Sequence, residues 1–240
     1  TTTHSLHRRQ RQMCIRDSND IEQRLRSLTK QPPEELAEAL DQLDPLITSL
    51  VAFSALTQEN MTHNEGWPFL ETGRRLERGA NLTTLLRTTM VPVITDNEEA
   101  LEVEAVLAVT DSLITYRRRY QAGTRVGALL DLVFQDESNP RALAYQLVQL
   151  ERLVAELPRT ELVSGRSRAQ KLMLRALTGI RLAEIDRLIQ PNAEGDQREA
   201  LDKELETVCD DLAAVSDALT AQYFRHEEQP HNLLSRGEGL

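Results

Sequence analysis

The sequence has little cysteine, a single tryptophan and no long apolar run. Of the two cysteines, Cys14 lies in a segment that we interpret below as foreign, which leaves Cys209 as the native thiol. One cysteine cannot form an internal disulfide or a zinc cluster. No stretch approaches the roughly 20 apolar residues that a membrane-spanning helix needs. These absences exclude a disulfide framework, and they predict a soluble cytoplasmic protein with no membrane contact.

Positive charge is also scarce, because the 240 residues carry a formal net charge of −10. An acidic balance disfavours nonspecific binding to nucleic acid or to anionic lipid, although a local arginine patch remains possible. Strand signals are missing too, since β-branched residues rarely alternate with polar ones and no hairpin turn joins two apolar runs. The sequence therefore predicts an all-α protein, a bundle of about seven or eight helices without a β-sheet.

The first residues do not read as natural protein. Residues 8–18, RRQRQMCIRDS, back-translate into a transposase-type sequencing adapter, so we interpret Thr1–Ser18 as foreign and exclude it from the fold. The alternative is a basic tail that binds nucleic acid or membrane. We expect a helical domain over residues 19–226 that lacks its N-terminal part, and a disordered tail over 227–240. A missing upstream helix would leave apolar surface uncovered, and the chain would then self-associate.

Breaker residues and apolar spacing predict the helices. We expect them over about 34–43, 44–61 (opened by Asp44-Pro45), 67–90, 97–121, 126–134, 166–189 and 196–224, with another between the start signal Ser138-Asn139-Pro140 and Pro158. Spacings of three and four residues predict apolar faces, which comprise Leu36, Leu40, Leu43, Ile47 and Leu50; Phe69, Gly73, Leu76, Ala80 and Thr83; Leu143, Leu147, Leu150, Val154 and Leu157; and Leu201, Leu205, Val208, Leu212, Val215 and Leu219. Gly73 and Ala80 would allow a second helix to approach closely.

Two of these helices are rich in arginine although the chain is acidic. The candidate anion-binding residues are Arg74, Arg75, Arg78, Arg117, Arg118 and Arg119, together with Glu77. Glu71 and Arg75 stand at i,i+4, a spacing that favours an ion pair. The arginines form either structural pairs on a solvated surface or a clamp for carboxylate or phosphate. We hypothesise that the helices over 67–90 and 97–121 pack together, bringing Arg74 and Arg78 near Arg117 and Arg119, with Glu77 in a buried pair.

Other constellations give little support for catalysis. Glu59 and His63 stand at i,i+4, a spacing that a metal ligand pair could use, but the Glu-x-x-His motif of a di-iron bundle is absent. Cys209 follows the apolar positions of its helix and is interpreted as buried filler. No metal, cofactor or catalytic set is therefore predicted. Whether the protein is an enzyme stays open at this point, with the balance toward a non-catalytic role.

Three blocks resemble the bacterial alpha-E domain family, a helical family of unknown molecular function. They are NMTHNEGWPFLETGRRLERG (60–79), DSLITYRRRYQ (111–121) and LLDLVFQDESNPRALAYQLVQLERLVAELP (129–158). Besides several of the arginines above, the motif positions are Trp67, Gly73, Asp111, Tyr116, Tyr120, Asp136, Asn139, Pro140 and Arg141. The resemblance implies a bacterial peptide-ligation or peptide-modification system that contains an ATP-grasp ligase and a transglutaminase-like protein.

Two functions are compatible with this resemblance. The first is a non-catalytic helical accessory domain that docks to the ATP-grasp ligase. The second is an enzyme or ligand-binding domain whose Arg/Glu-lined groove holds an acidic peptide or a phosphorylated intermediate.

Overall fold

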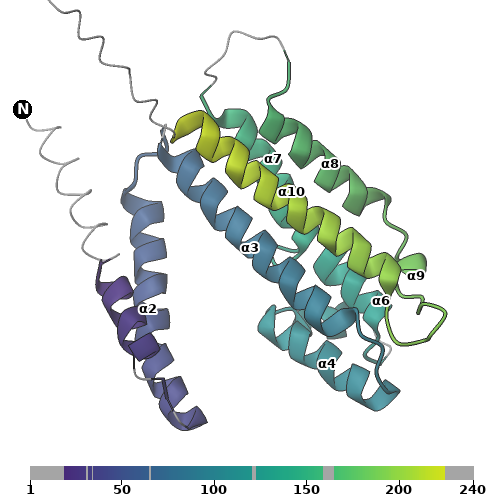
Figure 1. The fold of residues 1–240 in the computed structure, drawn as a ribbon. Helices are drawn as coiled ribbons and strands as arrows, with labels where there is room; N and C mark the ends of the chain where they lie inside the picture. The colour runs from purple at the N-terminus through teal and green to yellow at the C-terminus, as the bar shows by residue number, and fades with distance from the viewer. Residues whose placement is uncertain are drawn as a thin grey trace, which may run out of the picture. The chain divides into compact units, whose positions relative to one another are not determined.

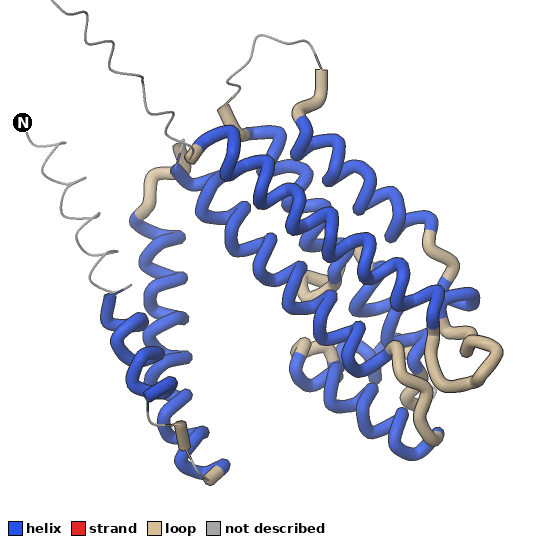
Figure 2. Tube along the Cα trace, in the orientation of Figure 1, coloured by secondary structure: helices blue, strands red, loops and turns tan. Residues whose placement is uncertain are grey.

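The computed structural model describes residues 19–30, 32–33, 35–64, 66–120, 123–158 and 165–224. Within these ranges the regular structure is helical, apart from one isolated bridge between Pro92 and Gln197, and no strand is present (Figure 2). The all-α prediction is thus confirmed. The segments predicted to be foreign (1–18) and disordered (227–240) lie outside the described residues. Residues 225–226, at the end of the predicted domain, lie outside them as well. The chain divides into two compact units, residues 1–67 and 68–240.

The first unit contains helical residues 19–30 and helix α2, Leu36–Asn60. Asp44-Pro45 does not open a second helix, as the sequence suggested, because α2 continues through Pro45. Proline removes one backbone hydrogen bond inside a helix, yet the helix continues unbroken on both sides of Pro45. The predicted apolar face is present on α2 but uncovered. Its residues Leu36, Leu40, Leu43, Ile47 and Leu50 are all exposed, whereas Leu46 and Thr57 are buried.

Helix α3, Gly66–Met90, lies close to its predicted position, but its buried face is rotated. The buried stripe consists of Thr72, Gly79, Leu82, Thr83, Leu86 and Met90. Gly73 is exposed, and a Cβ atom there would meet nothing within 4 Å. The close approach occurs instead at Gly79, where a Cβ would lie 3.1 Å from Leu212 Cδ1. The expectation for Gly73 is therefore wrong, because its neighbour Thr72 lies on the buried face in its place.

The helix expected over 97–121 is broken. Helix α4, Asp96–Val109, starts with a capping box, in which the Thr95 side chain accepts from the Glu98 backbone N–H and the Glu98 side chain accepts from the Thr95 backbone N–H. Helix α5 is the separate helix Leu113–Arg119. Asp111 between them has a φ of 50°, a left-handed conformation that ends a helix and that Asp tolerates better than most residues. Helix α6, Val126–Leu129, then runs into a π-helix, Leu130–Gln135, where one segment was expected.

Helices α7 (Leu143–Glu156), α8 (Arg168–Leu182), α9 (Ile185–Leu188) and α10 (Glu199–Tyr223) complete the second unit. The segment expected as one helix over 166–189 is divided between α8 and α9. Helix α8 packs against both α7 and α10, and α3 lies along α10 (Figure 1). Both predicted leucine-rich stripes, on α7 and on α10, are buried throughout. Together with apolar residues of α3, α4 and the π-helix they form one core.

A buried arginine joins the ends of several helices in this unit. Arg198, which is 6% exposed, donates from Nη1 to the carbonyl oxygens of Met90 (2.9 Å) and Pro92 (3.1 Å), and from Nε to that of Ile189 (3.3 Å). Its other terminal nitrogen binds the carboxylate of Glu99. The guanidinium thus connects the end of α3, the first turn of α4, the end of α9 and the start of α10.

We expect Arg198→Met to lower the free energy of unfolding by about 3 kcal/mol or more, because the change leaves a carboxylate and three carbonyls without their donor. Urea unfolding measures the effect. Arg118→Met is the matched control, since Arg118 is exposed and such surface changes stay within about 0.5 kcal/mol. Equal effects of the two substitutions would show that the Arg198 contacts do not stabilise the fold.

A second prediction compares one substitution at two glycines of α3. Gly79→Val should destabilise by about 1–3 kcal/mol, because the added atoms press on buried Leu212 in a filled core. Gly73→Val should change stability by less than about 0.5 kcal/mol, since that site is open and valine has a somewhat better helix propensity than glycine. Thermal melting of both variants gives the comparison, and a larger loss at Gly73 would contradict the observed face of α3.

Candidate functional site

The candidate site begins with charged side chains on one side of α3. Arg74 Nη1 lies 2.9 Å from Glu71 Oε1, and Arg75 Nη2 lies 3.6 Å from Glu71 Oε2. The predicted i,i+4 pair of Glu71 and Arg75 is therefore present, although Glu71 is closer to Arg74. All three side chains are largely shielded, with exposed fractions of 21% (Arg74), 18% (Arg75) and 13% (Glu71). One carboxylate thus serves two guanidiniums in a partly desolvated setting.

Two residues of helix α7 contact Arg75 of this cluster. Arg75 Nη1 donates to Gln146 Oε1 at 3.0 Å, and the guanidinium lies 5.7 Å from the centre of the Tyr145 ring. Gln146 is itself buried, and its Nε2 donates to the Pro140 carbonyl at 2.6 Å. Arg75 Nε is buried without a hydrogen-bond partner. Arg75 is therefore fixed in place by Gln146 while one of its donors stays unsatisfied.

Arg78 lies one turn further along α3 and lines a pocket of about 360 Å³. The lining residues are Arg78, Asn81, Leu82, Leu85, Val109, Thr110, Pro140, Arg141 and Gln146. Partial desolvation lowers the pKa of Arg78 and the positive charge of Arg75 lowers it further; Glu71 opposes this effect, and Arg74 and Arg141 add to the lowering. Among the described residues no carboxylate forms an ion pair with Arg78. The pocket therefore holds excess positive charge at its rim.

The second cation at this pocket is Arg141, in the turn before α7. Its Nη2 lies 3.5 Å from Asp111 Oδ2, and the two side chains are 57% and 82% exposed. Such exposed pairs contribute about 0–1 kcal/mol. A stronger anionic ligand would therefore compete readily with Asp111 for Arg141. The sequence marked Arg141 only as a motif position, and it missed Gln146, since neither has a local signal for its contact with α3.

The arginines of α5 do not join this cluster. Arg117 Nη2 binds Glu104 Oε1 at 2.7 Å, and Arg119 Nη1 binds Asp136 Oδ2 at 2.5 Å. Arg118 is exposed and has no ion pair within the described ranges. No contact among the described residues connects these side chains with Arg74 or Arg78. The end of α4 does lie beside α3 at the pocket, but Arg117 and Arg119 do not join Arg74 and Arg78 there, because they pair with Glu104 and Asp136 instead.

Glu77 corrects a further expectation. It is exposed, and the part of the chain that is described gives it no ion pair, so it is not half of a buried pair. Glu71 occupies that role instead. The error follows from the rotated face of α3, since a phase shift of one residue carries Glu77 from the shoulder of the helix to its solvent side.

Several motif positions of α5 and the π-helix bind one another. Tyr116 is buried, and its hydroxyl donates to the Gly123 carbonyl (3.3 Å) and accepts from the Arg125 backbone (3.0 Å). The Tyr120 hydroxyl binds Asp131 of the π-helix. Asn139 Nδ2 donates to the Leu132 carbonyl at 2.9 Å. These residues therefore fix the connection from α5 through the π-helix to α7, which is a structural role.

Trp67 and Cys209 are not among the residues that line the pocket. Trp67 stacks on His63 with ring centres 4.0 Å apart, and Cys209 is half-buried on α10. In the described ranges no group of three or more His, Cys, Asp and Glu side chains could hold a metal ion. None of the helices that the structure describes has both the length and the apolar content of a membrane span.

The Asp136 carboxylate gives a prediction about acid stability. Burial raises its pKa, but hydrogen bonds from Ser138 (2.6 and 2.7 Å) and Arg119 lower it more, so the net pKa lies below the ordinary 3.8. A depressed pKa stabilises the fold above the unfolded-state value, and that stability is lost as pH falls through the folded-state value.

Asp136→Asn should therefore lower the free energy of unfolding at neutral pH and flatten its decline between about pH 5 and pH 2. Asp210→Asn, on the exposed side of α10, is the control and should keep the wild-type decline. Unfolding in urea at a series of pH values measures both. Parallel curves for wild type and Asp136→Asn would refute this role for the carboxylate.

Comparison with known proteins shows a family to which the chain is similar. The alpha-E family model, described as a predicted alpha-helical domain with a conserved ER motif, matches residues 4–224. That range includes most of the segment interpreted as foreign, an interpretation that stays a prediction. The chain has Glu-Arg dipeptides at Glu77-Arg78 and Glu151-Arg152, and Arg78 lines the pocket.

Uncharacterized proteins of Mycobacterium bovis and of two Mycobacterium tuberculosis strains are 34% identical over 198 residues. The match covers 79% of this chain and 22% of each relative, so the chain spans about a fifth of their length. No solved structure matches. Because the family model covers most of the sequence, the chain belongs to the alpha-E family of helical domains.

Proposed function

We propose that this chain is a non-catalytic accessory domain that binds an acidic group at the pocket of Arg78 and Arg141. Its partner would be an ATP-grasp ligase, with a transglutaminase-like protein in the same bacterial peptide-ligation or peptide-modification system, as the family resemblance implies. The observation that carries the binding role is Arg78, a cation at a pocket without a carboxylate partner among the described residues.

The charge balance around Arg78 supports an anionic ligand. Arg74, Arg75 and Arg141 all act on it electrostatically, and Glu71 is the carboxylate that opposes them. Glu71 is already bound to Arg74 and Arg75, so it cannot also neutralise Arg78 at contact distance. A carboxylate or phosphate in the pocket would relieve the repulsion between these guanidiniums, and their planar forks suit either group.

The remaining lining favours an acidic group on an aliphatic stem. Asn81 adds a side-chain amide, while Leu82 and Leu85 form an apolar wall beside the cations. The volume of about 360 Å³ lies at the lower end of small-ligand pockets. An acidic side chain of a peptide would place its methylenes on the leucines and its carboxylate between Arg78 and Arg141.

The relatives support an accessory role within a larger protein. The matched segment makes up 22% of their length, so a region like this one is a minor part of a longer chain there. A domain of that kind can present a bound acidic segment to a neighbouring catalytic domain, since linkage raises the local concentration of the ligand.

We expect tetraglutamate to bind the wild-type protein, and we expect Arg78→Met/Arg141→Met to weaken the binding by about tenfold or more, because each charge-assisted hydrogen bond contributes about 1.5–3 kcal/mol. Arg118→Met/Arg168→Met removes the same charge from exposed positions and should weaken binding much less. Isothermal titration calorimetry at two salt concentrations separates the pocket from general attraction, which salt screens. Titration with tripolyphosphate distinguishes phosphate from carboxylate binding.

Equal losses in the two double variants would identify a merely solvated arginine surface. The partner proposal has its own test, in which the protein is co-expressed with an ATP-grasp ligase of the same bacterium. We expect the two proteins to co-purify and the activity of the ligase to change. Turnover of an acidic peptide by the isolated protein would instead favour the enzymatic alternative.

A further inference from the structure

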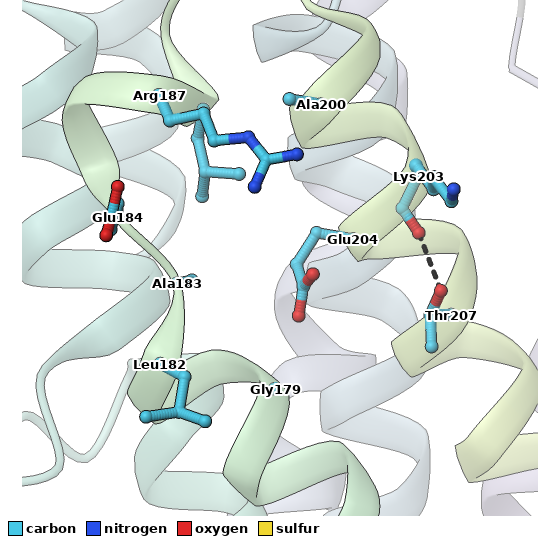
Figure 3. A pocket seen from close by; sticks show the side chains of 10 residues that line it. Gly179, Leu182, Ala183, Glu184, Arg187, Ala200, Lys203, Glu204 and Thr207 are labelled. Atoms are coloured by element: carbon cyan, nitrogen blue, oxygen red, sulfur yellow. Dashed lines mark hydrogen bonds between the residues drawn. The ribbon is translucent and has the colours of Figure 1, made fainter.

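A second pocket lies on another part of the same unit, between the end of α8, α9 and the first turns of α10. Its volume is about 400 Å³, and its lining includes Gly179, Leu182, Arg187, Leu188, Lys203 and Glu204 (Figure 3). None of these residues lines the Arg78 pocket. The sequence gave no indication of this pocket, because the break between α8 and α9 that opens it carries neither glycine nor proline.

Glu204 extends from α10 into this pocket toward Gly179 (Figure 3). A Cβ atom at Gly179 would lie 2.8 Å from Glu204 Oε1, so the absence of a side chain on α8 makes room for the carboxylate. Burial raises the pKa of Glu204, and the nearby charge of Arg187 lowers it in part. Within the described ranges no side chain forms a hydrogen bond or ion pair with this half-buried carboxylate, an unfavourable state for a charge.

Arg187 enters the same space from α9. Its guanidinium points toward the gap between α9 and α10, whereas Lys203 extends away from Glu204 (Figure 3). Arg187, like Glu204, has no ion-pair partner in the part of the chain that the structure describes. Two opposite charges therefore face one pocket without contacting each other, and Leu182 and Leu188 provide apolar surface beside them.

We propose that this pocket binds a small zwitterion, a free amino acid with an apolar side chain, whose ammonium group pairs with Glu204 and whose carboxylate pairs with Arg187. A ligand with both charges pairs with both protein groups at once. Its charge-assisted hydrogen bonds would offset the energetic cost of desolvating Glu204. An apolar side chain would lie on the leucines. The site is separate from the anion pocket at Arg78, and neither proposal depends on the other.

Three related probes test this assignment by calorimetry on the whole protein. L-leucine carries both charges, L-leucinamide only the ammonium, and N-acetyl-L-leucine only the carboxylate. We expect L-leucine to bind and each of the other two to bind about tenfold or more weakly, because each lacks one charge-assisted contact. No measurable binding of L-leucine would overturn the proposal. Equal binding of leucinamide would overturn it too, since the pocket would then recognise only an amine.

Matched variants assign the binding to the two residues. Glu204→Gln and Arg187→Gln should each weaken L-leucine binding by about tenfold or more, whereas Glu156→Gln and Arg168→Gln, which remove the same charges from exposed positions outside the pocket, should change it by less than about twofold. Gly179→Ala keeps every charge but displaces the Glu204 carboxylate, so it should weaken binding while raising helix stability. Circular dichroism confirms folding of each variant. Unchanged binding in both Glu204→Gln and Gly179→Ala would refute the site.

Discussion

The second unit depends on the burial of one guanidinium. Burying an arginine is costly unless its donors are satisfied, and Arg198 satisfies them with three main-chain carbonyls and Glu99. These acceptors belong to the ends of α3 and α9 and to the first turn of α4. The geometry of both pockets follows from this arrangement, because α4 contributes one wall of the Arg78 pocket, and α9 brings Arg187 over α10.

Several of the other arginines pair with carboxylates of the fold. Arg175, for example, binds Asp211, a carboxylate with no exposed side-chain surface, and Arg87 bridges α3 to α10 through Asp202 and Glu206. Such guanidiniums are accounted for by the fold. Arg78 and Arg187 face pockets, and among the described residues neither has a carboxylate at contact distance. A charge that the fold does not neutralise is the feature that these two pockets share.

The sequence predicted the leucine-rich helices well and the mixed ones poorly. On α7 and α10, large apolar residues at three- and four-residue spacing define a face without ambiguity, and every predicted position there is buried. On α3 the predicted Thr83 is buried, but Thr72 and Gly79 are buried in place of the predicted Gly73 and Ala80, so the predicted face was partly out of phase. The break at Asp111 depends on a left-handed backbone, and the Arg198 contacts join segments about a hundred residues apart. Neither has a signal in local spacing.

The family-like motif itself separates into two parts once the contacts are known. Tyr116, Tyr120 and Asn139 bind backbone or side chains of the adjoining segments, and these contacts are sufficient to explain their presence. Arg78 and Arg141 belong to the same motif blocks, yet one has no ion pair in the described structure and the other has only an exposed one. Exposed cations that contribute little to folding and converge on one pocket need another explanation. The proposed binding of an acidic group would supply it, because a carboxylate or phosphate from a ligand would complete their charge.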